Sequence, residues 1–168
     1  STPIKSSAAS DVYKRQSKNL ERVQKEQYGG VEATINSEME RINATLYSEK
    51  ANPPILHLEG NSYEFFTQDD TGTGIAYKGL VVYDLAIASL TKLPILVHDS
   101  LILKQISDEA VENILVRYME SGKQVIISLD KQDSYSKRTA EILEKQCVLH
   151  LAPNGRELFG RAWSRQET

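Results

Sequence analysis

Apolar residues stand three or four apart in one part of the chain and form short runs in others. This difference predicts where the helices and strands lie. Between residues 20 and 46 the apolar residues stand three or four apart, with charged and amide residues between them. That spacing predicts an amphipathic helix over residues 17–50, interrupted at Gly29-Gly30 and stopped by Asn52-Pro53-Pro54. Such a helix is typical of the end of a coiled coil or of the surface of a globular domain.

Two short runs rich in aliphatic and aromatic residues follow, at 55–58 and 63–66. Because Glu59-Gly60-Asn61-Ser62 separates them, they predict a β hairpin. Residues 75–90 are then apolar on nearly every side, with Lys78 and Asp84 as polar exceptions. This segment predicts a helix that is buried on both sides.

The second half of the chain alternates apolar strands with helices. Strands are predicted at residues 93–97 and 124–129, and between them lies a helix capped by Ser107. The remaining predicted elements are a helix and two strands at the C-terminal end, over residues 139–145, 147–151 and 157–159. This order favours an α/β fold, with a mostly parallel sheet flanked by helices.

Composition narrows the class of protein. The chain has 168 residues, 20 lysines and arginines against 23 acids, and a net charge of -3. It is long enough for one domain with a sizeable core and has no overall basic field for nucleic acid. Its single cysteine, Cys147, excludes an internal disulfide and suits a reducing compartment. The apolar run from residue 80 to 90 is too short to span a membrane and carries Asp84, so we expect a cytoplasmic protein with no membrane contact.

The first 16 residues resemble the in-frame translation of a laboratory sequencing adapter, most closely at residues 6–16. We therefore expect a non-native, disordered tail at residues 1–16. The predicted organisation continues with the amphipathic helix over residues 17–50 and a main domain over residues 51–168. We also expect the native polypeptide to extend upstream of Ser17.

A loop of small residues precedes the apolar helix and consists of Thr71, Gly72, Thr73 and Gly74. Glycine lets backbone amides turn outward, and a helix N-terminus favours an anion such as phosphate. Lys78 follows one turn later, where an ammonium group is within reach of a phosphate. The alternatives are a plain turn and a dinucleotide-binding loop, but Tyr77 stands where the latter needs a small residue.

The strand at residues 93–97 leads directly into His98, Asp99 and Ser100. An acid at the end of an apolar strand has the form of a Walker B motif, which holds Mg²⁺ directly or through water. A hydrolytic triad of these three neighbours is excluded, because adjacent strand residues point to opposite faces. Cys147 and His150 lack a second pair of ligands, which argues against zinc.

Four segments carry a family resemblance that covers about residues 35–164. They are NPPILHL (52–58), DTGTGIAYKGL (70–80), LPILVHDS (93–100) and LFGRAW (158–163). Together they resemble the C-terminal lobe of the ATP-binding-cassette heads of SMC- and RecF-like coiled-coil ATPases. They resemble more closely a bacterial domain of unknown function, family 2326, found at the end of such proteins.

The resemblance implies that the chain is the C-terminal half of a P-loop ATPase head, which binds ATP and Mg²⁺ with its own N-terminal lobe and a second head. Residues 71–74 would be the signature loop that contacts the γ-phosphate held by the opposite head. Asp99 would be the Walker B acid and metal ligand, and Asp108 would lie in a loop at the dimer interface. DNA and partner proteins of a repair, maintenance or defence system are the expected further partners.

Two positions depart from that family pattern. Ser100 stands where most such ATPases have a catalytic glutamate, and Asp130 stands where a switch histidine is expected. A serine cannot take a proton from water as a carboxylate can, so Asp130 and Asp99 are the remaining candidates for that role. The sequence therefore supports two hypotheses, an ATPase and a nucleotide-gated scaffold with little hydrolysis.

Overall fold

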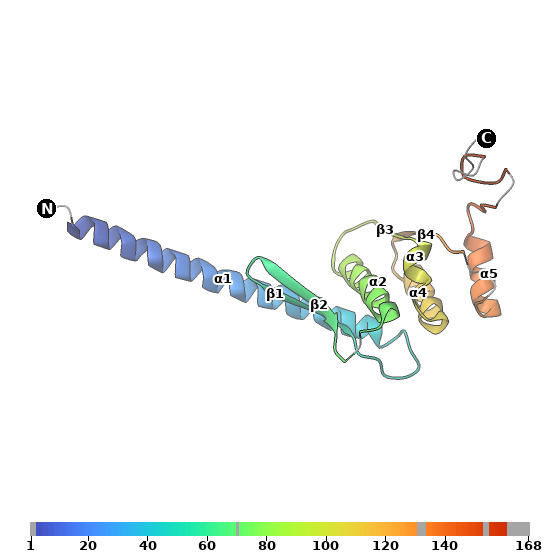
Figure 1. Ribbon diagram of the computed structural model, residues 1–168, viewed down its shortest axis with the longest axis horizontal. Helices are drawn as coiled ribbons and strands as arrows, with labels where there is room; N and C mark the ends of the chain where they lie inside the picture. The colour runs from blue at the N-terminus through green and yellow to red at the C-terminus, as the bar shows by residue number, and fades with distance from the viewer. Residues whose placement is uncertain (1–2, 70, 131–133, 153–154, 161–168) are drawn as a thin grey trace, which may run out of the picture. The chain divides into compact units, whose positions relative to one another are not determined.

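The computed structural model describes residues 3–69, 71–130, 134–152 and 155–160 (Figure 1). In these residues the chain is a mixed α/β fold with a long N-terminal helix and two small sheets. The residues fall into two compact units, Ser1–Asp130 and Lys131–Thr168.

Helix α1, Pro3–Asn43, is continuous through Gly29 and Gly30, so the predicted interruption is wrong. Each glycine costs a helix only about 1 kcal/mol relative to alanine, and the flanking residues are mostly good helix formers. Residues 3–16 continue this helix, where we expected a disordered tail. The helix ends at Asn43 rather than near residue 50, because Leu46 N–H donates to Asn43 O in a tight turn.

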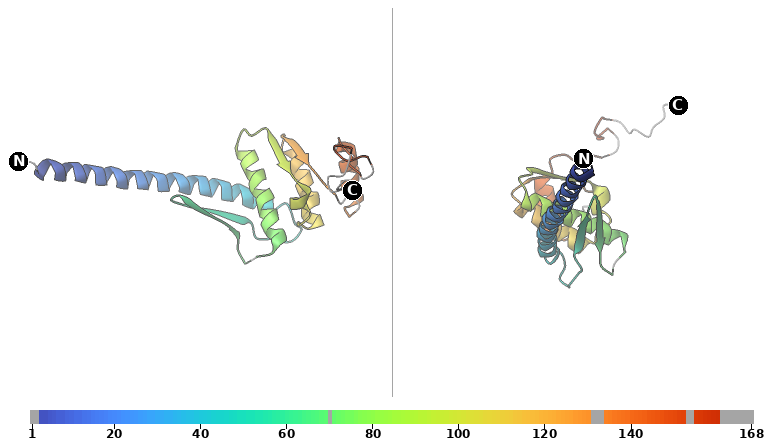
Figure 2. Two further views of the ribbon diagram at one scale, coloured as in Figure 1. Left: turned by 45° about the horizontal axis from the view of Figure 1, so that its top comes forward. Right: turned by 90° about the vertical axis from the view of Figure 1, so that its left-hand side faces the viewer.

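Strands β1, Pro54–Glu59, and β2, Ser62–Thr67, form the predicted antiparallel hairpin, with Leu56 opposite Phe65. The turn between them is made at Gly60, whose φ of 55° lies in the left-handed region that favours glycine. Figure 2 shows the hairpin lying alongside α1.

Side chains of α1 bind the backbone of β1 along the edge that β2 leaves open. The Asn36 amide donates to Leu56 O and accepts from Leu56 N–H, both at 2.8 Å. Glu32 Oε2 accepts from Leu58 N–H, also at 2.8 Å. The helix thus supplies the hydrogen bonds that a further strand would make, and it fixes the hairpin to α1.

Helix α2, Thr73–Leu90, packs against α1 and the hairpin and buries Val81, Val82 and Ala86 completely. Leu80 is 45% exposed, so the expectation of burial on both sides holds for only part of the helix. Among the described helices, α2 alone has the length and apolar composition to cross a membrane. In the structure α2 packs as a core helix, and it extends beyond the apolar run from residue 80 to 90.

The second sheet pairs β3, Ile95–His98, with β4, Gln124–Ile127, in parallel. Between them come the short helix α3, Ser100–Leu103, and the helix α4, Asp108–Glu120. Ser107 caps α4 as predicted, since its hydroxyl accepts from Ala110 N–H. The buried apolar face of α4 consists of Ala110, Val111, Ile114, Leu115 and Tyr118.

Only one face of this parallel sheet is covered. Leu96 and His98 are buried, whereas Ile95, Val97 and Ile126 are 40%, 65% and 50% exposed on the alternate positions. The sequence predicts buried strands here because both are apolar throughout. Parallel sheets normally have both faces covered. Here the face that carries Ile95, Val97 and Ile126 is uncovered.

The unit Lys131–Thr168 contains helix α5, Lys137–Gln146, capped by the Ser136 hydroxyl. The strands predicted at 147–151 and 157–159 are not formed; in this part of the described chain the only β pairing is a single bridge between Ala152 and Arg156. Positions 153 and 154, between the two predicted strands, lie outside the described residues. The apolar side chains of the predicted strands are instead exposed.

Candidate functional site

Asp99 is an exposed carboxylate directly after the C-terminal end of β3, at the position the Walker B reading requires. Three donors converge on its Oδ1 atom: Ser100 N–H at 2.6 Å, Ser128 Oγ at 2.7 Å and Ser100 Oγ at 3.3 Å. Ser128 follows β4, so the two parallel strands bring the residues together at one edge of the sheet. Ligands bind at this edge in open α/β sheets.

These hydrogen bonds keep Asp99 ionised. The bond from the Ser128 hydroxyl, assisted by the Ser100 amide, lowers the pKa of the Asp99 carboxyl below its ordinary value. Asp99 is also the N-cap of α3, and this structural role accounts for part of its bonding without any cation. An ionised, exposed carboxylate fits the oxygen ligands that Mg²⁺ prefers.

The other two catalytic candidates are Ser100, which directly follows Asp99, and Asp130, which comes shortly after β4. Ser100 starts α3, and its hydroxyl points back to Asp99. Asp130 forms an ion pair with Lys104, which follows α3. This ion pair engages one oxygen of the Asp130 carboxylate.

The small-residue segment 71–74 is partly helical, because α2 begins at Thr73. Thr71, Gly72 and Thr73 are exposed. Gly72 is the N-cap, and as a glycine it contributes no side-chain cap of its own. An exposed helix N-terminus is compatible with an anion. The φ of Gly72 is -64°, which any residue can adopt.

Gly74 has a packing role that sequence reasoning did not identify. A Cβ atom built on it would lie 2.4 Å from the backbone oxygen of Gln105, far inside normal contact. Gln105 belongs to the short helical stretch that begins with the Asp99 cap and continues through α3. Residues 71–74 therefore lie against one end of a segment whose other end is Asp99.

Lys78 does not point toward a phosphate site at the loop. Its side chain is fully buried, and its Nζ donates to Asn52 O at 3.3 Å and lies 5.4 Å from the centre of the Tyr47 ring. This placement corrects the assignment of Lys78 as a phosphate ligand. One turn from the loop, its side chain follows the inner face of α2, where it ties the segment before β1 to the helix.

His98, Asp84 and Tyr118 form a hydrogen-bonded chain that the sequence did not predict. His98 is only 3% exposed; its Nδ1 lies 2.5 Å from Tyr118 Oη and its Nε2 lies 2.9 Å from Asp84 Oδ2. Burial and the Asp84 charge raise the pKa of the Tyr118 phenol, so it stays protonated. The only sequence signal is a histidine within an otherwise apolar strand.

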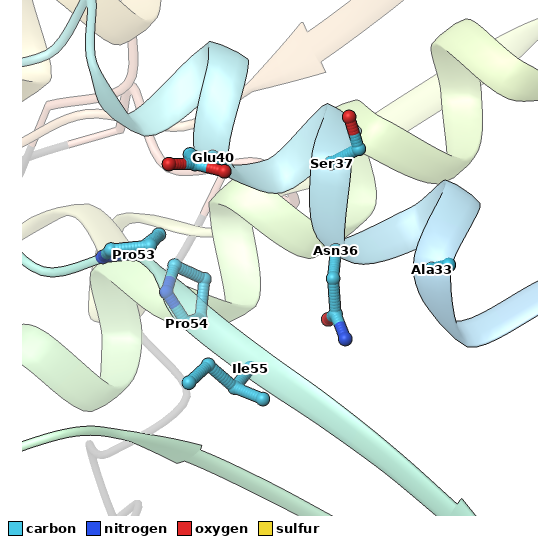
Figure 3. Close-up of a pocket in the computed structure, with 7 residues that line it drawn as sticks. All are labelled: Ala33, Asn36, Ser37, Glu40, Pro53, Pro54 and Ile55. Atoms are coloured by element: carbon cyan, nitrogen blue, oxygen red, sulfur yellow. The ribbon is translucent and has the colours of Figure 1, made fainter. Parts of the chain in front are cut away.

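A groove of about 400 Å³ lies between α1 and the start of β1 (Figure 3). Ala33, Asn36, Ser37 and Glu40 line it from α1, and Pro53, Pro54 and Ile55 from the other side. Its position separates it from Asp99, and it contains no metal-binding set. In the part of the chain that the structure describes, no three acids, histidines or cysteines cluster as metal ligands.

A crystal structure of the SmcHead bound to the C-winged helix domain of ScpA is similar to this chain at 18% identity and a TM-score of 0.49. The match covers 60% of this chain and 35% of the other, so it spans about a third of that head. No curated protein matches the chain.

The family model for an uncharacterised protein conserved in bacteria, DUF2326, matches residues 39–163, which is most of the chain. The chain belongs to this bacterial family. The match confirms the closer of the two resemblances found in the sequence.

Proposed function

We propose that this chain is the C-terminal lobe of an SMC-like ATPase head and contributes Asp99 and residues 71–74 to an ATP and Mg²⁺ site shared between two heads. Such a protein would act in the cytoplasm, in DNA repair, maintenance or defence. The observation that carries the proposal is the geometry of Asp99, an ionised and exposed carboxylate at the C-terminal edge of a parallel sheet.

The start of α2 supports the anion half of the site. Thr71, Gly72 and Thr73 are exposed at the N-terminus of α2. Backbone amides and the helix dipole at such an end favour a phosphate group. Gly74 allows this end of α2 to approach Gln105 closely, which places it next to the segment that starts at Asp99.

The uncovered face of the second sheet supports the proposal that another lobe of the head packs against it. Ile95, Val97 and Ile126 are exposed on one face of a two-stranded parallel sheet. Two parallel strands are marginal alone, and parallel sheets are normally covered on both faces. A second lobe of the same head, adding strands and a cover, would bury these side chains.

A second candidate is a nucleotide-gated scaffold that binds ATP but scarcely hydrolyses it. Ser100 replaces the expected catalytic glutamate, and the Asp130 carboxylate is ion-paired with Lys104. A serine hydroxyl cannot take a proton from an attacking water as a carboxylate can, and the ion pair occupies the Asp130 carboxylate. Asp99 remains free to hold a cation in either candidate.

The test uses the native polypeptide, including any sequence upstream of Ser17, and compares Asp99→Asn with Glu141→Gln. Both changes turn an exposed acid into its amide, but Glu141 lies on α5. We expect Asp99→Asn to weaken Mg²⁺-dependent binding of a fluorescent ATP analogue by about tenfold or more, and Glu141→Gln to leave it unchanged. Equal binding by wild type and Asp99→Asn, or no binding by either, would overturn the proposal.

Turnover distinguishes the two candidates. Phosphate release that disappears in Asp99→Asn supports the ATPase. Mg²⁺-dependent binding without measurable phosphate release supports the scaffold.

A further inference from the structure

We propose that His98 is a positioning residue that fixes the orientation of the Asp99 carboxylate through bonds to two helices. Its relevance to a cation rests on the proposed function, but the positioning itself does not. His98 is the last residue of β3, and its side chain points into the core while Asp99 is exposed.

Each ring nitrogen of His98 has a hydrogen-bond partner. The Asp84 carboxylate only accepts hydrogen bonds, so the 2.9 Å contact requires a proton on Nε2. Nδ1 lies 2.5 Å from the Tyr118 hydroxyl, which can both donate and accept. The two contacts hold the ring to α2 through Asp84 and to α4 through Tyr118.

Backbone bonds carry this constraint from His98 to Asp99. Besides the peptide link, His98 O accepts from Ser128 N–H at 3.2 Å. The Ser128 hydroxyl in turn donates to Asp99 Oδ1 at 2.7 Å, and it accepts from Ser100 N–H at 2.9 Å. Movement of His98 would therefore shift both the peptide before Asp99 and the hydroxyl that orients its carboxylate.

The same contacts link Asp99 to the segment at the start of α2. Asp84 and Thr73 lie on one helix, about 16 Å apart along its axis at 1.5 Å per residue. A helix of this length moves largely as a rigid body, so a displacement at Thr73 reaches Asp84 and then His98. His98 is thus a hydrogen-bonded link between α2 and the strand that precedes Asp99.

The first test is nuclear magnetic resonance of the isotope-labelled 168-residue chain. The reporters are the Ser100 amide proton, which donates to Asp99 at 2.6 Å, and the Asp99 carboxyl carbon. We expect Tyr118→Phe and His98→Leu to shift both signals, because each variant leaves a polar partner unpaired. His98→Gln keeps an amide donor and acceptor and should restore the wild-type positions.

Asp84→Asn is the matched control, because its amide oxygen still accepts from Nε2 and the reporters should stay in place. Signals from the Leu56 and Leu58 amides, which donate to Asn36 and Glu32 in the same compact unit, check that each variant is folded. If His98→Leu does not fold, Tyr118→Phe decides, since it removes one oxygen. Wild-type reporter positions in folded Tyr118→Phe would overturn the inference.

The second test measures Mn²⁺ affinity in the native polypeptide with bound nucleotide. We expect Tyr118→Phe to weaken it by about tenfold, as for other residues that orient a metal ligand, and His98→Gln to weaken it less than His98→Leu. Unchanged Mn²⁺ affinity in Asp99→Asn would refute the proposed cation site. If Tyr118→Phe nevertheless shifts the two reporter signals of the first test, the positioning by His98 is still supported.

Discussion

The close contact at Gly74 gives the most direct quantitative prediction. In Gly74→Ala the new Cβ atom would lie 2.4 Å from the Gln105 carbonyl oxygen. That oxygen is backbone and cannot rotate away, so either the first turn of α2 or the segment after α3 must move. The φ of this position is not the obstacle, because it lies within a helix.

The size of the effect follows from two opposing terms. Inserting a methyl group into a packed site typically costs about 1–3 kcal/mol. Alanine is the better helix former by up to about 1 kcal/mol in a helix interior, and by less in a first turn such as this one. We therefore expect Gly74→Ala to lower the free energy of unfolding by about 1–2 kcal/mol, which lowers Tm by roughly 3–6 °C.

Thermal unfolding followed by circular dichroism measures this change, and Gly29→Ala is the control. Gly29 lies inside α1, and no atom lies within 4 Å of a Cβ built on it. That variant should be as stable as wild type or more stable. A Tm for Gly74→Ala at or above the wild-type value would refute the packing role of Gly74. The predicted role of this glycine in a phosphate-binding loop would then remain.

Two further predictions concern hydrogen bonds. Asn36→Ala removes both bonds to the Leu56 backbone and should cost about 1–3 kcal/mol of unfolding free energy, whereas Asn19→Ala on the exposed part of α1 should have little effect in the same denaturant titration. The Ser128 hydroxyl is the main cause of the lowered pKa of Asp99. The ionised carboxylate therefore stabilises the folded state above the unfolded-state pKa near about 3.9, and this stability is lost as the pH falls through the lowered pKa. Acid unfolding of Asp99→Asn should lack this loss of stability, and an acid-unfolding profile identical to wild type would contradict the prediction.

Local signals in the sequence predicted much of the fold. The Ser107 cap and the apolar spacing of α4 were sufficient for that helix, and the turn at Gly60 was sufficient for the hairpin. The predicted position of Asp99 directly after an apolar strand is also confirmed. These features depend on neighbours within a few residues, which is the information that periodicity and capping contain.

The features that were missed depend on contacts between distant parts of the chain. The burial of Lys78 depends on Asn52 and Tyr47, and the need for glycine at position 74 depends on Gln105. The chain from Asp84 to Tyr118 joins three elements that no local pattern relates. The two strands predicted near the C-terminus failed for a related reason. Their residues favour a strand locally, but a strand also needs a neighbouring strand to pair with.

The attachment of β1 to α1 has a mechanical consequence. Because Asn36 and Glu32 bind the strand's own amides and carbonyl, the helix cannot bend or rotate there without breaking backbone hydrogen bonds. Torque applied along the long helix would therefore be transmitted to the hairpin instead of being absorbed at a flexible joint. The same bonds also shield that strand edge from pairing with foreign chains, which lowers the risk of aggregation.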